Sequence, residues 1–117
     1  MKHLTVLITG AGAPGAPGII KSLSLVRERK IKIIGVDMDK NAVGFAMVDK
    51  HYLVPNSENK NFIKEVLRIA KKEKVDVIIP LVTKELLKFA KNKSKFEKFG
   101  IKISISEPKG LEIDNNK

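Results

Sequence analysis

The sequence predicts an α/β fold in which a parallel sheet is covered by helices on both faces. Short apolar segments alternate with amphipathic segments along the whole chain. The apolar segments are rich in β-branched residues and carry few polar ones, which is typical of strands buried on both faces of a parallel sheet. A segment with four glycines in nine positions, residues 10–18, joins the first strand to the first helix. Backbone can approach a ligand closely at such a junction.

The alternating segments give the order of the elements. We expect strands at residues 4–8, 31–36, 51–54, 75–79 and 101–105. Helices are expected at residues 18–29, 41–48, 62–74 and from 83 to 96 or 99, with Thr83 as the N-cap of the last helix and Gly100 at its end. Because parallel crossovers are right-handed, these elements predict a three-layer Rossmann-like open sheet of five mainly parallel strands, in the order 3-2-1-4-5.

That strand order also predicts where a ligand binds. The chain reverses direction between the first and fourth strands, and open α/β sheets bind ligands at this point, beyond the carboxyl ends of the strands. The crevice should lie between residues 9–18 and residues 80–85, with residues 37–39 beside it.

Composition limits the classes of function. The 117 residues suit one domain, and the absence of cysteine excludes disulfides, zinc-thiolate sites and a cysteine nucleophile within this chain. The net charge of +10 comes from lysines on the predicted polar helix faces, without interleaved aromatic residues, so we expect no nucleic-acid partner. No apolar run approaches the roughly 20 residues that span a bilayer, and no secretion signal is evident. We expect a soluble cytoplasmic protein with no membrane partner.

The glycine segment matches a known phosphate-binding spacing. Gly10, Gly12 and Gly15 satisfy G-x-G-x-x-G, and Asp37 ends the second strand, where a dinucleotide fold would bind a ribose hydroxyl. Asp37 is therefore a cofactor-binding candidate only if a dinucleotide binds. Pro14 and Pro17 remove two N–H donors, which argues against a simple pyrophosphate cradle. The alternative is that the glycines only permit a tight turn.

A second reading of the glycines points to dehydrogenases. Gly12, Gly15 and Gly18 fit the G-x-x-G-x-x-G spacing of extended short-chain dehydrogenases and epimerases. Those enzymes need a Tyr-x-x-x-Lys pair, but Tyr52, the only tyrosine, is followed four positions later by Asn56. This argues against a dehydrogenase that is complete in this chain.

Among the remaining polar residues, Glu85 is the strongest candidate. It begins a predicted helix beside the crevice, so it either faces a ligand or interacts with the helix dipole. Asp37 and Asp39 could hold a magnesium ion or hydroxyls, although two solvated carboxylates at a strand end are the alternative. The two histidines are isolated, Asp76 suits a hydrogen bond at a loop-to-strand junction, and no metal-ligand cluster is predicted.

Several segments together resemble the amino-terminal domain of ATP-grasp ligases, and most closely carbamoyl-phosphate-synthase large-subunit-like proteins. They are Val6-Leu-Ile-Thr-Gly-Ala-Gly12, Ile33-Ile-Gly-Val-Asp37-Met-Asp39, Ala42-Val-Gly-Phe-Ala46 to Asp49-Lys50, Tyr52-Leu-Val-Pro55, and Asp76-Val-Ile-Ile-Pro80 with Glu85. The resemblance implies a Rossmann-like domain over residues 1–110 and, at residues 111–117, the start of the segment that leads into an ATP-grasp domain.

The resemblance also implies which binding functions belong to this domain and which belong to the ATP-grasp domain. ATP and magnesium would bind mainly in the ATP-grasp domain, outside this chain, in cis or in a partner subunit, and no catalytic residue would lie here. Gly10, Gly12 and Gly15 would lie next to a carboxylate or phosphate of a small substrate, with Glu85 on the facing loop. The family usually has an acidic residue where Lys84 stands, and more often glycine where Ala13 and Pro14 stand. We therefore expect a domain of an ATP-dependent carboxylate-amine ligase that is inactive alone.

Two other classes of function stay open at this point. A stand-alone domain that binds NAD(P) or another nucleotide is supported by Gly10 to Gly15 together with Asp37. A structural or oligomerisation module is supported by the alternating helices and the lack of a certain catalytic residue.

Overall fold

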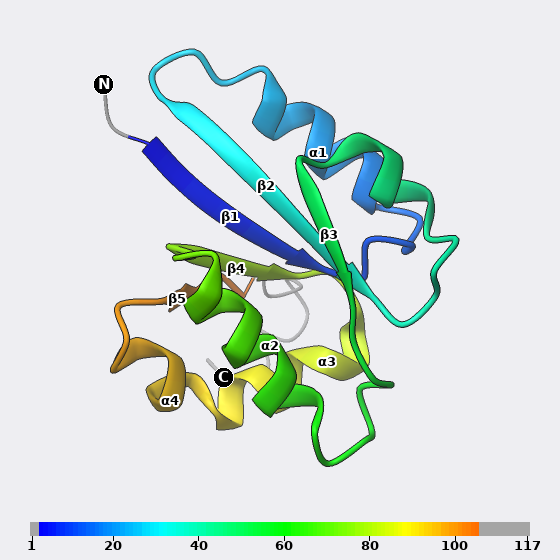
Figure 1. Cartoon of the computed structure of the whole chain (residues 1–117), viewed down its shortest axis with the longest axis vertical. Coiled ribbons are helices and arrows are strands. Elements are labelled where there is room, and N and C mark those ends of the chain that lie inside the picture. The colour runs from blue at the N-terminus through cyan, green and yellow to red at the C-terminus, as the bar shows by residue number, and fades with distance from the viewer. Residues whose placement is uncertain (1–2, 106–117) are drawn as a thin grey trace, which may run out of the picture.

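A computed structural model describes residues 3–105 and contains one parallel sheet of five strands. The strands are β1 (His3–Thr9), β2 (Lys30–Asp37), β3 (Lys50–Leu53), β4 (Val77–Pro80) and β5 (Lys102–Ile103). They lie in the order β3-β2-β1-β4-β5, and each neighbouring pair is parallel (Figure 1). The predicted α/β class and strand order are therefore confirmed.

Helices cover both faces of the sheet. The helix α1 (Ala16–Ser24) and the short 3₁₀ helix η1 (Val43–Met47) lie on one face, and α2 (Phe62–Lys72), α3 (Thr83–Lys91) and α4 (Lys93–Glu97) lie on the other (Figure 1). Alternate residues of β1 point to opposite layers. Val6 and Ile8 pack with Ile20 of α1, whereas Leu7 packs with the phenylalanines of α2, α3 and α4. This is the three-layer arrangement that strands apolar on both faces require.

The first helix is shorter at its carboxyl end than predicted. It begins at Ala16, with Pro17 in the first turn where no hydrogen-bonded N–H is needed, and it ends at Ser24 instead of Arg29. Leu23 is the last residue of this segment that packs on the core, and Leu25 and Val26 are exposed. Without burial beyond Leu23, little stabilises a longer helix.

The segment after residue 83 forms two helices instead of one. Asn92 interrupts it, and the side-chain amide of Asn92 donates a hydrogen bond of 2.8 Å to the carbonyl oxygen of Lys88. This local bond competes with the helical pattern, as Asn side chains often do. Thr83 is the first helical residue and not the N-cap, which is Val82 and has no capping side chain.

The side chains of Asp76 and Glu73 connect neighbouring elements of the fold through hydrogen bonds. The carboxylate of Asp76 accepts a 2.9 Å hydrogen bond from the backbone N–H of Thr5, which confirms the junction predicted for it. Glu73, which follows α2, accepts a hydrogen bond from Tyr52 Oη and pairs with Lys50 at 3.2 Å. The Tyr52 hydrogen bond is the main reason that the pKa of Glu73 is lowered, and it also raises the pKa of Tyr52. These contacts tie β3 to the end of α2.

Among residues 3–105, no helix combines the length and the apolar character needed to cross a membrane. The segment predicted to lead into a further domain, residues 111–117, lies outside the described residues.

Candidate functional site

The glycine loop begins where β1 ends against the start of α3. Gly10 has a φ of +73°, in the left-handed region that side chains other than glycine rarely adopt. A Cβ atom at Gly10 would lie 2.6 Å from Val82 Cγ2. Glycine is therefore required here both by the backbone conformation and by the close approach of the residue before α3.

Most N–H groups of the loop already have partners. The Gly12 N–H donates to Asp37 Oδ2 at 2.8 Å, and the Ala13 N–H donates to the Gly10 carbonyl oxygen at 2.8 Å. The Ala16 N–H, at the start of α1, donates to the Ala13 carbonyl oxygen at 3.0 Å. The other Asp37 oxygen, Oδ1, accepts from the Asp39 N–H at 2.9 Å. The loop is thus held closed on itself, and the donors that a pyrophosphate would need are largely occupied.

The three predicted glycines have different surroundings. Gly10 lines a cavity, Gly12 lies beside Asp37 and Ala42, and Gly15 is the exposed N-cap of α1. A further glycine, Gly44, is equally constrained, because a Cβ there would lie 2.4 Å from the Ala11 carbonyl oxygen. Its N–H donates to that same oxygen at 2.9 Å. A glycine inside a predicted helix was the only sequence signal for this contact.

Glu85 is buried at the junction of β1 and α3. Its carboxyl oxygen Oε1 accepts a hydrogen bond of 2.7 Å from Thr9 Oγ1, and the two residues are only 8% and 1% exposed. Burial raises the pKa of Glu85, and the hydrogen bond from Thr9 opposes this effect. The charge of Asp37 raises this pKa further, and Lys84 lowers it. Glu85 therefore lies at the predicted crevice as a buried acid whose side chain is hydrogen-bonded to Thr9 at the end of β1.

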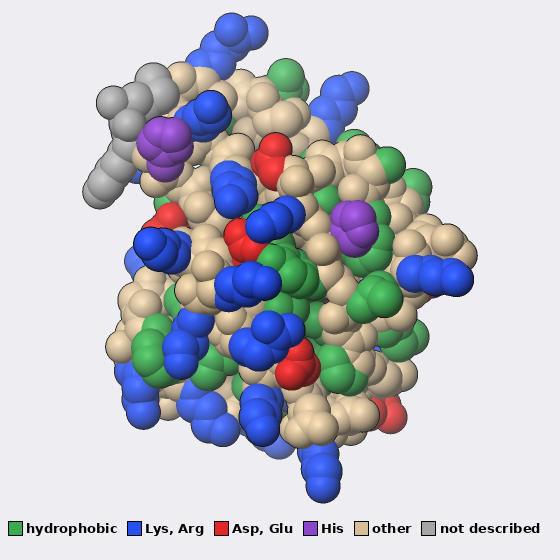
Figure 2. Space-filling view, in the orientation of Figure 1, with side chains coloured by type: hydrophobic (Ala, Val, Ile, Leu, Met, Phe, Trp, Pro, Cys, Tyr) green, Lys and Arg blue, Asp and Glu red, His purple; other side chains and the backbone are tan. Residues whose placement is uncertain are grey.

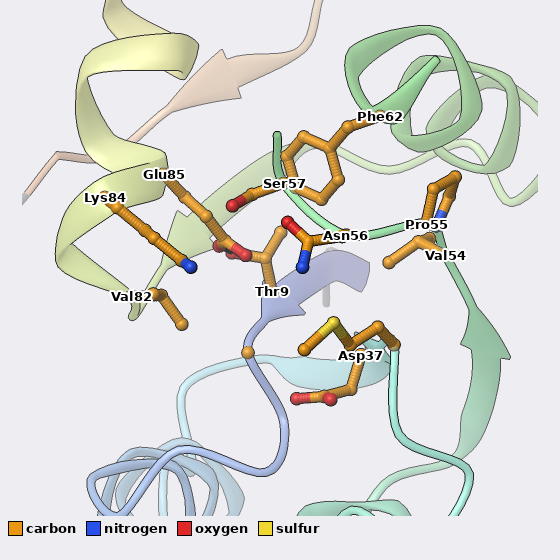
Figure 3. A pocket seen from close by; sticks show the side chains of 12 residues that line it. Thr9, Asp37, Val54, Pro55, Asn56, Ser57, Phe62, Val82, Lys84 and Glu85 are labelled. Carbon is orange, nitrogen blue, oxygen red and sulfur yellow. Dashed lines mark hydrogen bonds between the residues drawn. The ribbon is translucent and has the colours of Figure 1, made fainter. Parts of the chain in front are cut away.

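A small cavity of about 100 Å³ opens at the carboxyl edge of the central strands. Its lining residues end or directly follow β1, β2 and β3, or lie at the starts of α2 and α3: Thr9, Gly10, Asp37, Met38, Val54, Pro55, Asn56, Ser57, Phe62, Val82, Lys84 and Glu85. Figure 3 shows Lys84 and Glu85 reaching from α3 toward Thr9, with Asn56 and Ser57 opposite. Among the described residues that line it, Lys84 is the only one with a cationic side chain.

The cavity lies where the crevice was predicted, but part of its lining was not predicted. Residues 54–57 form one wall, and Ser57 is buried there at 6% exposure. They directly follow β3, so the rule that ligands bind beyond the carboxyl ends of strands could have found them. Gly12 and Gly15, in contrast, do not line this cavity.

The described residues hold no group of three or more His, Asp and Glu side chains that could bind a metal ion. The Asp39 carboxylate accepts a hydrogen bond from the Asn41 N–H at 2.9 Å. The His51 ring stacks on Phe45, with ring centroids 4.4 Å apart, and His3 is exposed at the start of β1.

The parallel sheet and the strand order define a Rossmann-like α/β domain, with a cavity at the switch point of the sheet. Residues 6–104 match the family model described as "PylC-like, N-terminal domain". The chain belongs to this family, whose members are N-terminal domains of ATP-grasp ligases. The predicted resemblance to the amino-terminal domain of ATP-grasp ligases is thereby confirmed. No curated protein matches the sequence.

Comparison with solved structures finds one that shares the fold and one of lower similarity. A dTDP-glucose 4,6-dehydratase from Bacillus anthracis in complex with NAD has a TM-score of 0.57 at 17% identity, over 87% of this chain and 36% of that one. A short-chain dehydrogenase from Leptospira borgpetersenii with bound NAD⁺ has a TM-score of 0.49 at 15% identity, over 86% of this chain and 45% of that one. The chain spans about a third of the length of the dehydratase. At 17% identity the likeness to the dehydratase shows the fold alone.

Proposed function

We propose that this chain is the substrate-side domain of an ATP-dependent carboxylate-amine ligase and is not catalytically complete alone. The observation that carries the proposal is the family match together with a cavity at the switch point of the sheet. ATP and magnesium would be bound mainly by a catalytic ATP-grasp domain outside this chain, in cis or in a partner subunit. The proposed setting is the cytoplasm.

The size of the cavity supports a binding role for part of a substrate. Pockets that enclose a whole small molecule usually measure about 300–1,000 Å³. At about 100 Å³, this cavity suits one end of a molecule whose remainder contacts other residues. That matches a domain that supplies one wall of a shared active site.

The charges of the lining suggest which group would enter. The Lys84 ammonium would pair with a carboxylate or phosphate of the substrate. Gly10, without a side chain, would let this group approach the end of β1. Glu85, whose raised pKa favours its protonated form, would donate a hydrogen bond to the same group when neutral. Gly12 and Gly15 would act mainly by shaping the loop.

The hydrogen bonds of the loop argue against the alternative of a stand-alone NAD(P)-binding domain. The Gly12 N–H is occupied by Asp37, and two prolines remove further donors. Asp37 still has free lone pairs that could accept a ribose hydroxyl, so it is the occupied and missing N–H donors that disfavour a dinucleotide. A closer relation to carbamoyl-phosphate-synthase large-subunit-like proteins rests on the ordered segments of the sequence and is also part of the proposal.

Binding to this chain separates the two functions. Isothermal titration calorimetry of the chain with NAD⁺, NADP⁺ and magnesium-ATP is expected to give no tight binding. Micromolar binding of NAD⁺ would overturn the proposal in favour of the dinucleotide-binding alternative. A native reading frame without an ATP-grasp domain, and with no ATP-grasp gene beside it, would also contradict it.

Kinetics of the protein expressed from its native reading frame test the site itself. Phosphate release from ATP is followed with panels of carboxylates and amines. The variant Lys84→Met is expected to raise KM for the acid by about tenfold, the value of one lost charge-assisted contact, and to leave KM for ATP unchanged. The matched control Lys98→Met, on an exposed lysine outside the cavity, should leave both KM values unchanged. Equal effects of both variants would refute the role of Lys84.

A further inference from the structure

A second hollow lies between α2 and the α3–α4 pair, on the outer surface of the helical layer. It measures about 400 Å³, larger than the cavity at the glycine loop. Its lining residues are Asn59, Lys60, Ile63, Lys64, Leu67, Lys88, Asn92 and Lys95, and we call it the α2–α3 groove. Ile63 and Leu67 are half-buried and pack on the main core, so they form an apolar floor.

Among the residues that the structure describes, the charged side chains on the walls of the α2–α3 groove are all positive. Four lysines line it, two from the α2 side and two from α3 and α4, and no acidic residue of the range 3–105 does. Lys88 donates a hydrogen bond to the Ser57 carbonyl oxygen. Among residues 3–105, the other three lysines form no ion pair. The nearest acid on α2, Glu65, pairs with Arg68 at 3.0 Å.

The groove is part of a wider basic surface. Residues 58–98 contain twelve lysines and arginines and six acidic residues. Two of these acids are engaged inside the fold, because Glu73 is bound by Tyr52 and Lys50 and Glu85 is buried against Thr9. Figure 2 shows lysine and arginine side chains gathered over the half of this face where α2 and α4 lie.

A ligand of the α2–α3 groove must cover the apolar floor and also pair with the lysines of the walls. Carboxylates on either side of one or two apolar side chains would pair with the lysines and cover Ile63 and Leu67. A second copy of this chain does not fit, because two proteins of net charge +10 repel when their basic faces meet. A single-stranded nucleic acid would pair with the lysines, but none of the described residues that line the groove has an aromatic side chain on which its bases could stack.

We propose that the α2–α3 groove is a docking site for an acidic, amphipathic segment of a protein partner. The segment would lie between the helices in the way that amphipathic helices bind apolar grooves. Its carboxylates would speed association and fix its direction, and its apolar side chains would supply the burial. The groove is adjacent to the candidate site, because the Ser57 residue that Lys88 contacts lines the smaller cavity.

Fluorescence polarisation with a designed peptide tests the proposal. The probe is a fluorescein-labelled helical peptide of Leu, Glu and Ala, with its leucines on one face and its glutamates beside them. It is expected to bind saturably. The double variant Lys64→Glu/Lys95→Glu should weaken binding at least about tenfold, because like charges would then face the peptide. The double variant Lys30→Glu/Lys102→Glu changes the net charge equally on exposed strand residues outside the groove and should change the Kd less than about twofold. Circular dichroism checks that each variant is folded.

Several results would overturn the proposal. Absence of saturable binding excludes such a site, and equal loss in both double variants indicates attraction to net charge alone. Undiminished binding of a peptide with serine in place of leucine would exclude a role for the floor. Tighter binding of an oligothymidylate than of the acidic peptide would assign the surface to a nucleic acid instead.

Discussion

Replacing Gly10 by alanine tests how the glycine loop is built. Two costs add up at this position. An alanine held at a φ of +73° costs about 1–2 kcal/mol relative to its preferred conformations. Its Cβ would also lie 2.6 Å from Val82 Cγ2, so Val82 must leave its rotamer, which costs about 0.5–1.5 kcal/mol. We therefore expect Gly10→Ala to lower the free energy of unfolding by about 2–3 kcal/mol.

Thermal unfolding followed by far-UV circular dichroism measures this effect. For a domain of about 100 residues the loss corresponds to a fall in Tm of about 10 °C. Gly18→Ala is the matched control, because Gly18 lies inside α1 and a Cβ there meets no atom within 4 Å. It should stabilise the protein by about 0.5–1 kcal/mol.

A double-mutant cycle separates the two costs of Gly10→Ala. In a Val82→Ala background the steric part disappears, and about 1–2 kcal/mol from the backbone should remain. A Gly10→Ala variant that is as stable as Gly18→Ala would contradict a backbone requirement for glycine at residue 10. An unchanged cost of Gly10→Ala in the Val82→Ala background would contradict the steric contribution of Val82.

Three further predictions concern the charges and the core. Glu85→Gln should raise Tm at pH 7 and leave Tm unchanged below about pH 4. Because burial raises the pKa of Glu85 in the folded protein, this residue contributes stability below its unfolded pKa of about 4.3, and that stability is lost as pH rises through the folded pKa. A lower Tm for this variant at pH 7 would contradict the assignment. Tyr52 is the only tyrosine in a chain without tryptophan, so absorbance at 295 nm follows its ionisation alone. The pKa of Tyr52 should lie above its usual value of about 10 and should move back toward that value in Glu73→Gln. Stability from the Tyr52 hydroxyl should be lost as pH rises through that titration, and a normal tyrosine pKa in the native protein would be inconsistent with the hydrogen bond. Phe89→Ala removes a fully buried ring that contacts Phe62 and Phe96 at centroid distances of 5.8 Å, and urea unfolding should show a loss of about 3–5 kcal/mol, against less than about 0.5 kcal/mol for the exposed control Leu87→Ala.

The class of fold and the order of the strands follow from the sequence alone. Apart from Lys32 and Asp76, segments such as 31–36 and 75–79 are apolar on both faces, and only a sheet covered by helices on both sides buries them. Handed crossovers then leave few possible orders, and the predicted one is observed. The same rules placed the crevice beside Gly10, Asp37 and Glu85, because the carboxyl ends of parallel strands meet at one edge of the sheet.

Helix ends were predicted less well, since they depend on tertiary burial. The pattern of Leu25 and Val26 extended the first helix, but the core they would need ends at Leu23. Asn92 ended α3 through a side-chain hydrogen bond that no periodicity reveals. The wall formed by residues 54–57 was not predicted as part of the crevice, although its position directly after β3 could have indicated it.

The contacts that the residues of the glycine loop make depend on tertiary packing. The motif Gly10-x-Gly12-x-x-Gly15 is compatible with an open phosphate cradle, but the Gly12 N–H is bound by Asp37, 25 residues away in the sequence. Glu85 could have been a solvated residue in the first turn of a helix, yet it is buried against Thr9, 76 residues away. Local sequence fixes which backbone conformations and apolar faces are available. Which donor meets which acceptor depends on strands and helices that pack together only in the folded chain.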